Sequence, residues 1–352
     1  MNPSLHPHRL PVFIAFWFLA LVRLVTTLHA DVAVPTDPAV FHLYLLIGQS
    51  NMAGPATIEA LDQWTDPRIL MLNTDNQWVL AKNPLHPDQS GGVGPGMDFA
   101  RKMLESNPSI SIGLIPCAVN GSSIETWRER NVNYIRAVSR YNSVKAQGVL
   151  KGILMHQGEA NSIPKLSTNP TYINTLINTV IPPFRAEVGN PFLPFVAGQV
   201  GQFLKTESYP SFTWINQQIA QLPTKLIFTG YVSSTGLTDG GDSLHFDTAS
   251  ERELGIRYAA AMSKIQDRFM GFRKDATEVL PEIYYHDSFG YYYDKYDPWV
   301  YHFAIGWVYY AGNSGDYLWL WSPNLGWMTT TLEIGPEVYV FDGASWICIC
   351  GD

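Results

Sequence analysis

The chain has 352 residues, of which 46% are hydrophobic, and a formal net charge of −8. A chain of this length can bury one substantial core and a second, smaller one. Because Lys and Arg do not cluster, we expect no nucleic-acid partner, since phosphate binding depends on concentrated positive charge. The three cysteines, Cys117, Cys348 and Cys350, contain no C-x-x-C pair, so neither a zinc knuckle nor a dense disulfide framework is indicated.

The N-terminal residues have the layout of an export signal. Arg9 precedes an apolar stretch at 11–22, and a small residue, Ala30, follows a short polar segment. The apolar stretch is too short to cross a bilayer, which takes about 20 residues. We therefore expect a signal peptide over 1–30 with cleavage near Ala30, a secreted or periplasmic protein, and no membrane span in the mature chain. Because Arg23 interrupts the segment, a retained signal-anchor is the alternative.

Residues 41–265 alternate short apolar runs with helical patterns, which is typical of βα units around a mainly parallel sheet. The predicted strands are 41–48, 111–119, 149–158, 192–200 and 226–232. Each is followed by a loop rich in Gly, Ser or Asn. In such a sheet the ligand site lies at the carboxyl ends of the strands, so these loops are the expected site of the chemistry.

A polar connector at 266–280 leads to an aromatic-rich segment, 281–352, which contains 20 of the chain's 46 Phe, Tyr and Trp residues. Alternating strands recur there around turns near Gly306, Gly326 and Gly343. This pattern predicts an antiparallel meander, and thus a small all-β aromatic-repeat domain. Its aromatic side chains either form the core of a thin sheet or stack on sugars, which would give a polysaccharide or cell-surface contact.

The first predicted strand ends in LYLLIGQSNMAG, which places Ser50 directly after an apolar run. A nucleophilic hydroxyl needs a base and a third group that orients the base. Asp242 and His245 in GGDSLHFD are spaced so that the carboxylate can reach the near ring nitrogen. The alternative is an N-capping aspartate beside an incidental surface histidine. The serine motif is not G-x-S-x-G, because Met52 stands at the second glycine position, so an α/β-hydrolase elbow is disfavoured.

Two residues after other strands are candidate donors to an oxyanion. The backbone N–H of Gly121 can approach a bound carbonyl closely, and the amide of Gln157 can supply a second hydrogen bond. The alternatives are a simple turn at Gly121 and a polar strand end at Gln157. We expect Gln49 and Asn51 to satisfy the polar groups of the turn that exposes Ser50.

Glu159, in HQGEAN, is expected to orient its neighbours. An alternative reading makes His156, Glu159, His245 and Asp239 ligands of a metal ion, although no compact ligand spacing is present.

Five motifs together resemble the SGNH-type hydrolases, specifically the branch of sialate O-acetylesterases and carbohydrate esterase family 6 acetyl esterases. They are GQSNMAG, GVGPGMDFA, NGSSIETW, HQGEAN and DSLHFD. The resemblance covers residues 41–265 and implies a flavodoxin-like three-layer α/β fold. It also implies an acetyl esterase of O-acetylated sugars that needs no metal and no cofactor.

The resemblance implies a role for each site residue. Ser50 is the nucleophile, His245 the base and Asp242 its orienting group. The oxyanion hole combines the backbone N–H groups of Ser50 and Gly121 with the Gln157 side chain. The family usually has Gly-Gly where this chain has Asn120 and Gly121, and commonly has Asp at the position of Asn161.

The expected function is removal of O-acetyl groups from sialic acid or from a polysaccharide such as acetylxylan, through an acetyl-serine intermediate. Trp127, Arg128 and the loop 201–210 are candidates to line the sugar site. The alternative is a secreted, non-catalytic protein that binds carbohydrate through 281–352.

Overall fold

In the computed structural model, the described residues are 32–89, 91–163, 171–270, 273, 276–296, 299–314, 317–331 and 337–349. The predicted signal peptide lies outside them. No helix in these ranges combines the length and the apolar character that a membrane crossing requires.

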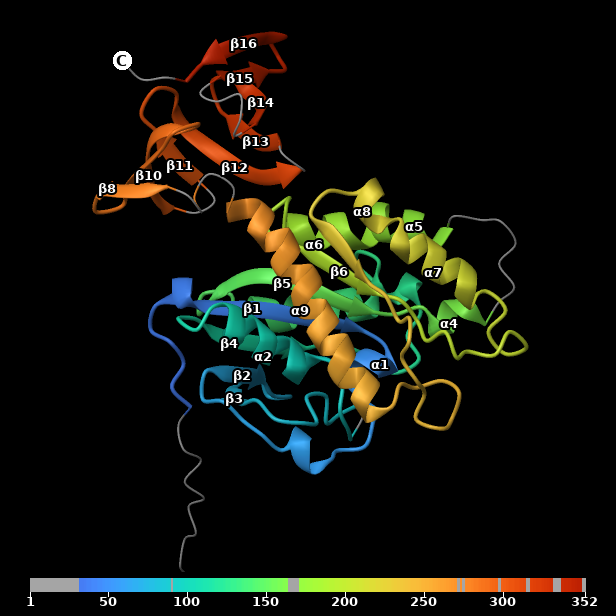
Figure 1. Cartoon of the computed structure of the whole chain (residues 1–352). Helices are drawn as coiled ribbons and strands as arrows, with labels where there is room; N and C mark the ends of the chain where they lie inside the picture. Colours follow the sequence, from blue (N-terminus) through green and yellow to red (C-terminus); the bar gives the residue numbers. More distant parts are fainter. Residues whose placement is uncertain are drawn as a thin grey trace, which may run out of the picture. The chain divides into compact units, whose positions relative to one another are not determined.

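The larger domain is built on a seven-stranded sheet with the order β3-β2-β4-β1-β5-β6-β7 (Figure 1). Its strands are β1 (Phe41–Gly48), β2 (Ile69–Leu72), β3 (Trp78–Leu80), β4 (Ser111–Pro116), β5 (Val149–His156), β6 (Phe195–Gly198) and β7 (Thr229–Val232). Neighbouring strands are parallel except for β3, which pairs antiparallel with β2. The predicted parallel sheet is confirmed.

All five predicted strands exist, and β1 has the predicted bounds. The range 192–200 was too long because Phe192 and Leu193 are buried in the core without joining the ladder. The range 226–232 was too long because Phe228, which has a φ of 54°, interrupts extended backbone before β7. β2 and β3 were not predicted, since runs of four and three residues carry little periodicity.

Helices cover both faces of this sheet. They are α1 (Ser50–Ala53), α2 (Gly96–Ser106), α3 (Val132–Asn142), α4 (Glu159–Ser162), α5 (Thr171–Thr175), α6 (Ile181–Val188), α7 (Phe212–Ala220), α8 (Leu222–Lys225) and α9 (Thr248–Met270). Short turns of 3-10 helix are η1 (Pro38–Val40), η2 (Ala60–Asp62) and η3 (Ile124–Trp127), and η4 (Leu176–Val180) is a π-helical turn.

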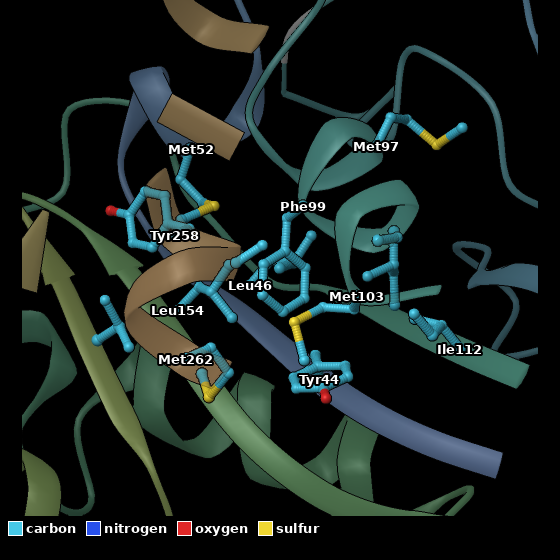
Figure 2. Packing of buried hydrophobic residues seen from close by; sticks show 14 of the residues in the cluster. Tyr44, Leu46, Met52, Met97, Phe99, Met103, Ile112, Leu154, Tyr258 and Met262 are labelled. Atoms are coloured by element: carbon cyan, nitrogen blue, oxygen red, sulfur yellow. The ribbon is translucent and has the colours of Figure 1, made fainter. Parts of the chain in front are cut away.

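The side chains of β1 show why three layers form. Tyr44 and Leu46 point into a core shared with α2 and α9, where they pack with Met103 and Met262 (Figure 2). Leu45 and its odd-numbered neighbours point to the opposite face, into a core shared with α3, α6 and α7. Successive strand residues face opposite sides of a sheet, so an almost uniformly apolar strand must be covered on both. The predicted three-layer fold is confirmed.

The C-terminal segment forms a separate nine-stranded antiparallel sheet in which each strand pairs with its neighbours in the sequence. The strands are β8 (Thr277–Leu280), β9 (Ile283–His286), β10 (Gly290–Tyr296), β11 (Trp299–His302), β12 (Gly306–Ser314), β13 (Tyr317–Ser322), β14 (Gly326–Thr331), β15 (Glu337–Val340) and β16 (Ser345–Cys348). The predicted meander is confirmed. Because α9 continues to Met270 and β8 begins at Thr277, the connector is shorter than the predicted 266–280.

The two faces of this sheet differ in composition. One face buries mainly aliphatic residues, among them Val308, Leu320 and Met328. The repeated tryptophans point the other way, with Trp327 39% exposed and Trp346 49% exposed. Other aromatic residues of this sheet, Tyr292 and Tyr310 among them, are fully buried in its core, so the aromatic side chains serve in part as core and in part as a partly exposed surface.

Candidate active site

Ser50 begins the four-residue helix α1, directly beyond the end of β1. The strand ends at Gly48, which has a φ of 120°, and a Cβ atom there would lie 2.0 Å from the carbonyl oxygen of His156. Only glycine allows β1 and β5 to approach so closely. Ser50 is 8% exposed. The chain thus turns sharply at the carboxyl edge of the sheet and presents one hydroxyl there.

His245 and Asp242 complete a linear arrangement with this hydroxyl. The Nε2 atom of His245 lies 3.0 Å from the Oγ of Ser50. The Nδ1 atom of His245 lies 2.6 Å from the Oδ2 of Asp242. The structure therefore brings together the three residues that the sequence predicted as nucleophile, base and orienting group.

The loop that carries these two residues is shaped by Asp242 itself. Its Oδ1 accepts hydrogen bonds from the backbone N–H groups of Leu244 (2.9 Å) and His245 (2.8 Å). The capping role and the orienting role, considered as alternatives from the sequence, are thus filled by the two oxygens of one carboxylate. Burial raises the pKa of Asp242, but the hydrogen bonds from His245 and Leu244 outweigh this effect, so the pKa lies below its ordinary value.

An ionised Asp242 fixes the tautomer of the imidazole. A carboxylate only accepts hydrogen bonds, so Nδ1 of His245 carries a hydrogen and donates it. In the neutral ring Nε2 is then an acceptor, and the hydroxyl of Ser50 donates to it. This is the arrangement in which a histidine can remove a proton from a serine.

Two backbone N–H groups, in the segments that follow β1 and β4, are candidate oxyanion donors. Among the described residues, no hydrogen bond is made by the N–H of Ser50, at the start of α1, or by that of Gly121. Gly121 has a φ of 66° and open space around it, so backbone conformation and not crowding requires glycine there. The side chain of Ser122 donates to the carbonyl of Gly48 (3.1 Å), which joins this loop to the end of β1.

Asn120, at a position that usually holds glycine in the family the sequence resembles, is held away from this region. Its backbone N–H donates to the Oε1 of Gln89 (3.0 Å), and its side-chain amide donates to the carbonyl of Gln89 (2.7 Å). The asparagine therefore ties the Gly121 loop to the loop that precedes α2.

Gln157 is buried beside the site but already uses its amide hydrogens. Its Nε2 donates to Asn161 Oδ1 (2.7 Å), to the carbonyl of Ser122 (3.2 Å) and to Gln49 Oε1 (3.3 Å). As placed here, the side chain braces three loops. To donate to an oxyanion, as predicted, it would have to release one of these acceptors.

The amides that flank Ser50 reach across to other loops and do not satisfy their own turn, so that expectation is wrong. Gln49 Oε1 accepts from the backbone N–H of Ala160 (3.2 Å), beyond β5. Asn51 donates to Glu159 Oε1 (2.6 Å) and accepts from the backbone N–H of Phe246 (3.2 Å). Asn51 thereby connects α1, which begins at Ser50, to both the loop after β5 and the loop of His245.

Glu159 is buried at the start of α4. Burial raises the pKa of Glu159, but the neighbouring His156 and the hydrogen bond from Asn51 lower it below its ordinary value. His156 also lies 3.2 Å from the hydroxyl of Tyr258 through its Nδ1 atom. Glu159 thus contacts Asn51 and His156, and its orienting role stays a prediction.

The alternative metal site gains no support. Asp239 accepts from the backbone N–H of Ser243 (2.7 Å). In the part of the chain that the structure describes, no three His, Cys, Asp or Glu residues are grouped so as to hold a metal ion.

The residues expected to line the sugar site differ in their exposure. Trp127 is fully buried, and its indole N–H donates to Ser122 Oγ (3.1 Å), so it supports the Gly121 loop and cannot contact substrate. Arg128 is half-buried and donates to the hydroxyl of Thr175 (3.3 Å). Sequence reasoning missed the contacts of Ser122 with Gly48 and of Asn161 with Ile124, because these partners are distant in the sequence.

The three-layer fold and the arrangement at its carboxyl edge define a hydrolase of the SGNH type. The family model described as "Carbohydrate esterase, sialic acid-specific acetylesterase" matches residues 40–264. The chain belongs to this family, and it is a carboxylic ester hydrolase that acts on acetylated carbohydrate.

Known proteins share this domain. A probable carbohydrate esterase of Arabidopsis thaliana is 31% identical over 245 residues, which make up 62% of this chain and 89% of that protein. An X-ray structure of an Arabidopsis thaliana protein has a TM-score of 0.58 and 28% identity, covering 65% of this chain and 99% of that one. The crystal structure of NanS, at 18% identity, has a TM-score of 0.55 and covers 66% and 99% of the two chains, a likeness of fold alone.

Proposed function

We propose that the chain is a serine O-acetylesterase in which Ser50 is the nucleophile, His245 the general base and Asp242 the group that orients His245. The observation that carries the proposal is the pair of contacts on one imidazole, 3.0 Å to the serine hydroxyl and 2.6 Å to the carboxylate. These distances are within hydrogen-bond reach for proton transfer. A non-catalytic carbohydrate-binding role is not favoured, because the contacts of His245 with Ser50 and Asp242 are those that proton transfer from a serine needs.

The reaction has two halves. His245 takes the Ser50 proton through Nε2 while Oγ attacks the acetyl carbonyl, and Asp242 stabilises the imidazolium. The tetrahedral intermediate collapses to acetyl-serine as His245 gives its proton to the departing sugar hydroxyl. Water then attacks the acetyl-serine with the same base, and acetate leaves with Ser50 restored.

The oxyanion is stabilised by the backbone N–H groups of Ser50 and Gly121, which have no other acceptor among the described residues. One such donor is worth about 3 kcal/mol in comparable sites. Gln157 holds the loops that carry these donors. A direct hydrogen bond from its side chain is the alternative, and it requires that one of its present bonds be broken.

The substrate class and the location follow from features outside the triad. The family description favours an acetylated sialic acid, while the exposed aromatic face of the C-terminal sheet favours contact with a polysaccharide such as acetylxylan. The export signal in the sequence favours secretion or a periplasmic location, with cleavage near Ala30.

The test is acetate release by wild type and by Ser50→Ala from 4-nitrophenyl acetate, acetylated xylan and O-acetylated sialic acid. We expect turnover by wild type and none above background by the variant. Ser109→Ala is the matched control, because Ser109 is exposed and bonds only within its own turn, to Asn107. Retained activity in Ser50→Ala would reject the assignment of the nucleophile.

A further inference from the structure

A second recess lies on the same edge of the large sheet as Ser50. It is a cavity of about 250 Å³. Its lining residues are Thr74, Asn76, Asp88, Arg136, Ser139 and Arg140. Thr74 and Asn76 belong to the turn that follows β2, and β2 runs parallel to β4 and thus to β1. Every lining residue is polar, which disfavours an apolar ligand and favours one rich in hydroxyl and charged groups.

The two arginines come from successive turns of α3 and are held differently. Arg140 is buried, and its Nη2 donates to the backbone carbonyls of Leu72 (2.8 Å) and Asn73 (3.0 Å). Its Nε is buried and therefore does not face a ligand in the recess. Arg136 is more exposed and pairs with Asp88 at 2.6 Å. The lining therefore carries one net positive charge, in a chain whose net charge is −8.

The recess is connected to the oxyanion loop. Asp88 precedes Gln89, which holds both the backbone and the side chain of Asn120, the residue before Gly121. Adjacent strands lie about 4.8 Å apart, so β2 is about 10 Å from β1 across β4. A neighbouring part of the same sugar substrate can span a separation of this order.

We propose that this recess is a subsite for the carboxylate of an acidic sugar, borne by the substrate whose acetyl group is at Ser50; the inference rests on the proposed esterase function. A guanidinium binds a carboxylate through parallel charge-assisted hydrogen bonds. Asp88 and the hydroxyl of Ser139 supply acceptors for ring hydroxyls, as Thr74 and Asn76 do. A plain inorganic anion would leave these acceptors unused.

The first experiment measures binding of sodium D-glucuronate and of its neutral methyl ester by isothermal titration calorimetry. The proteins are wild type, Arg136→Gln and the matched control Arg130→Gln, whose side chain is 89% exposed. We expect glucuronate to bind wild type and Arg130→Gln with equal affinity and to bind Arg136→Gln at least tenfold more weakly. We expect the methyl ester to bind wild type at least tenfold more weakly than glucuronate does. No binding, equal binding of the ester, or an unaffected Arg136→Gln overturns the proposal, as does sulfate binding as tight as that of glucuronate.

The second experiment tests whether the carboxylate belongs to the substrate. With acetylxylan that bears glucuronate, Arg136→Gln should raise KM about tenfold and leave kcat within twofold, whereas its KM for 4-nitrophenyl acetate, which bears no carboxylate, should rise less. Arg130→Gln is the control that keeps wild-type activity on both substrates. Equal effects of Arg136→Gln on both substrates would overturn the subsite. Calorimetry on Ser50→Ala separates the two hypotheses, because the subsite predicts unchanged glucuronate binding whether or not Ser50 is the nucleophile.

Discussion

Asn161 hydrogen-bonds to Gln157, Ile124 and Glu125, so replacing it with aspartate tests how much these contacts stabilise the fold. Its Oδ1 accepts from Gln157 Nε2 (2.7 Å) and from the backbone N–H of Ile124 (2.9 Å). Its Nδ2 donates to both oxygens of Glu125, at 3.1 and 3.3 Å. In Asn161→Asp both acceptor contacts remain possible, but the donor is replaced by a second carboxylate facing Glu125.

The size of the effect follows from the distance and the exposure of the pair. Two unit charges about 4 Å apart repel by about 1 kcal/mol in water and about 4 kcal/mol at an effective dielectric constant of 20. Because Glu125 is exposed, solvent screens most of this repulsion. We expect Asn161→Asp to lower the free energy of unfolding by about 1 to 2 kcal/mol at pH 8.

The pH dependence has a definite sign. In wild type, burial raises the pKa of Glu125, but hydrogen bonds from Ser123 and Asn161 outweigh burial and lower the pKa below its ordinary value. The ionised Glu125 therefore stabilises the folded state, and this contribution is lost as pH falls. In Asn161→Asp the facing carboxylates raise the pKa of the pair. A raised pKa gives stability that is present at low pH and is lost as pH rises through the folded-state value. The free energy of unfolding of Asn161→Asp should therefore fall further below that of wild type at pH 8 than at pH 5.

The assay is urea unfolding of wild type and variant at both pH values. The double variant Glu125→Gln with Asn161→Asp is the control, because a glutamine at 125 can donate to the new carboxylate and should recover most of the loss at pH 8. A deficit that is equal at both pH values, or larger at pH 5, would refute the electrostatic reasoning.

Three further predictions concern single side chains. Asp242→Asn should lower kcat by about 10² to 10⁴-fold with little change in folding, because the carboxylate that fixes the imidazole tautomer is lost; kcat near the wild-type value would contradict this role. Gln157→Ala should lower the free energy of unfolding by about 1 to 3 kcal/mol if Gln157 is a brace, whereas a hundredfold loss of kcat with unchanged stability would make it a direct oxyanion donor. Burial raises the pKa of Glu251 well above its ordinary value, so the contribution of this residue to stability falls as pH rises. The free energy of unfolding of Glu251→Gln should therefore increase relative to that of wild type between pH 5 and pH 8. Glu253→Gln is the control that should show no such increase, because its carboxylate is half-exposed and paired with Arg257.

The residues that we propose to perform the chemistry were predictable because each has a local signal. Ser50 follows an apolar run that ends in Gly-Gln, and the spacing of Asp242 and His245 suits one tight turn. Parallel strands bring their carboxyl ends to one edge, so residues that follow different strands could be placed together from the amino-acid sequence alone. The fold class follows in the same way from apolar runs that alternate with helical patterns.

The supporting contacts were not predictable, for a physical reason. Asn51 lies 108 residues from Glu159, and Gln157 lies 35 residues from Ser122, so neither bond has a signature in local spacing. Both depend on the order of β4, β1 and β5 in the sheet, which places the ends of two distant strands on either side of the nucleophile.

The burial of Trp127 was also not predictable from the sequence. Its place beside a polar motif suggested a sugar platform, yet its ring is fully buried and its N–H holds Ser122. In the C-terminal sheet, period-two alternation gave the strands correctly but could not say which face is covered, because aromatic and aliphatic side chains both suit a half-buried sheet. The core takes Val308 and Leu320, which leaves Trp327 and Trp346 outside. Partly exposed aromatic rings can stack on sugar rings, so this sheet is where a polysaccharide contact should be sought.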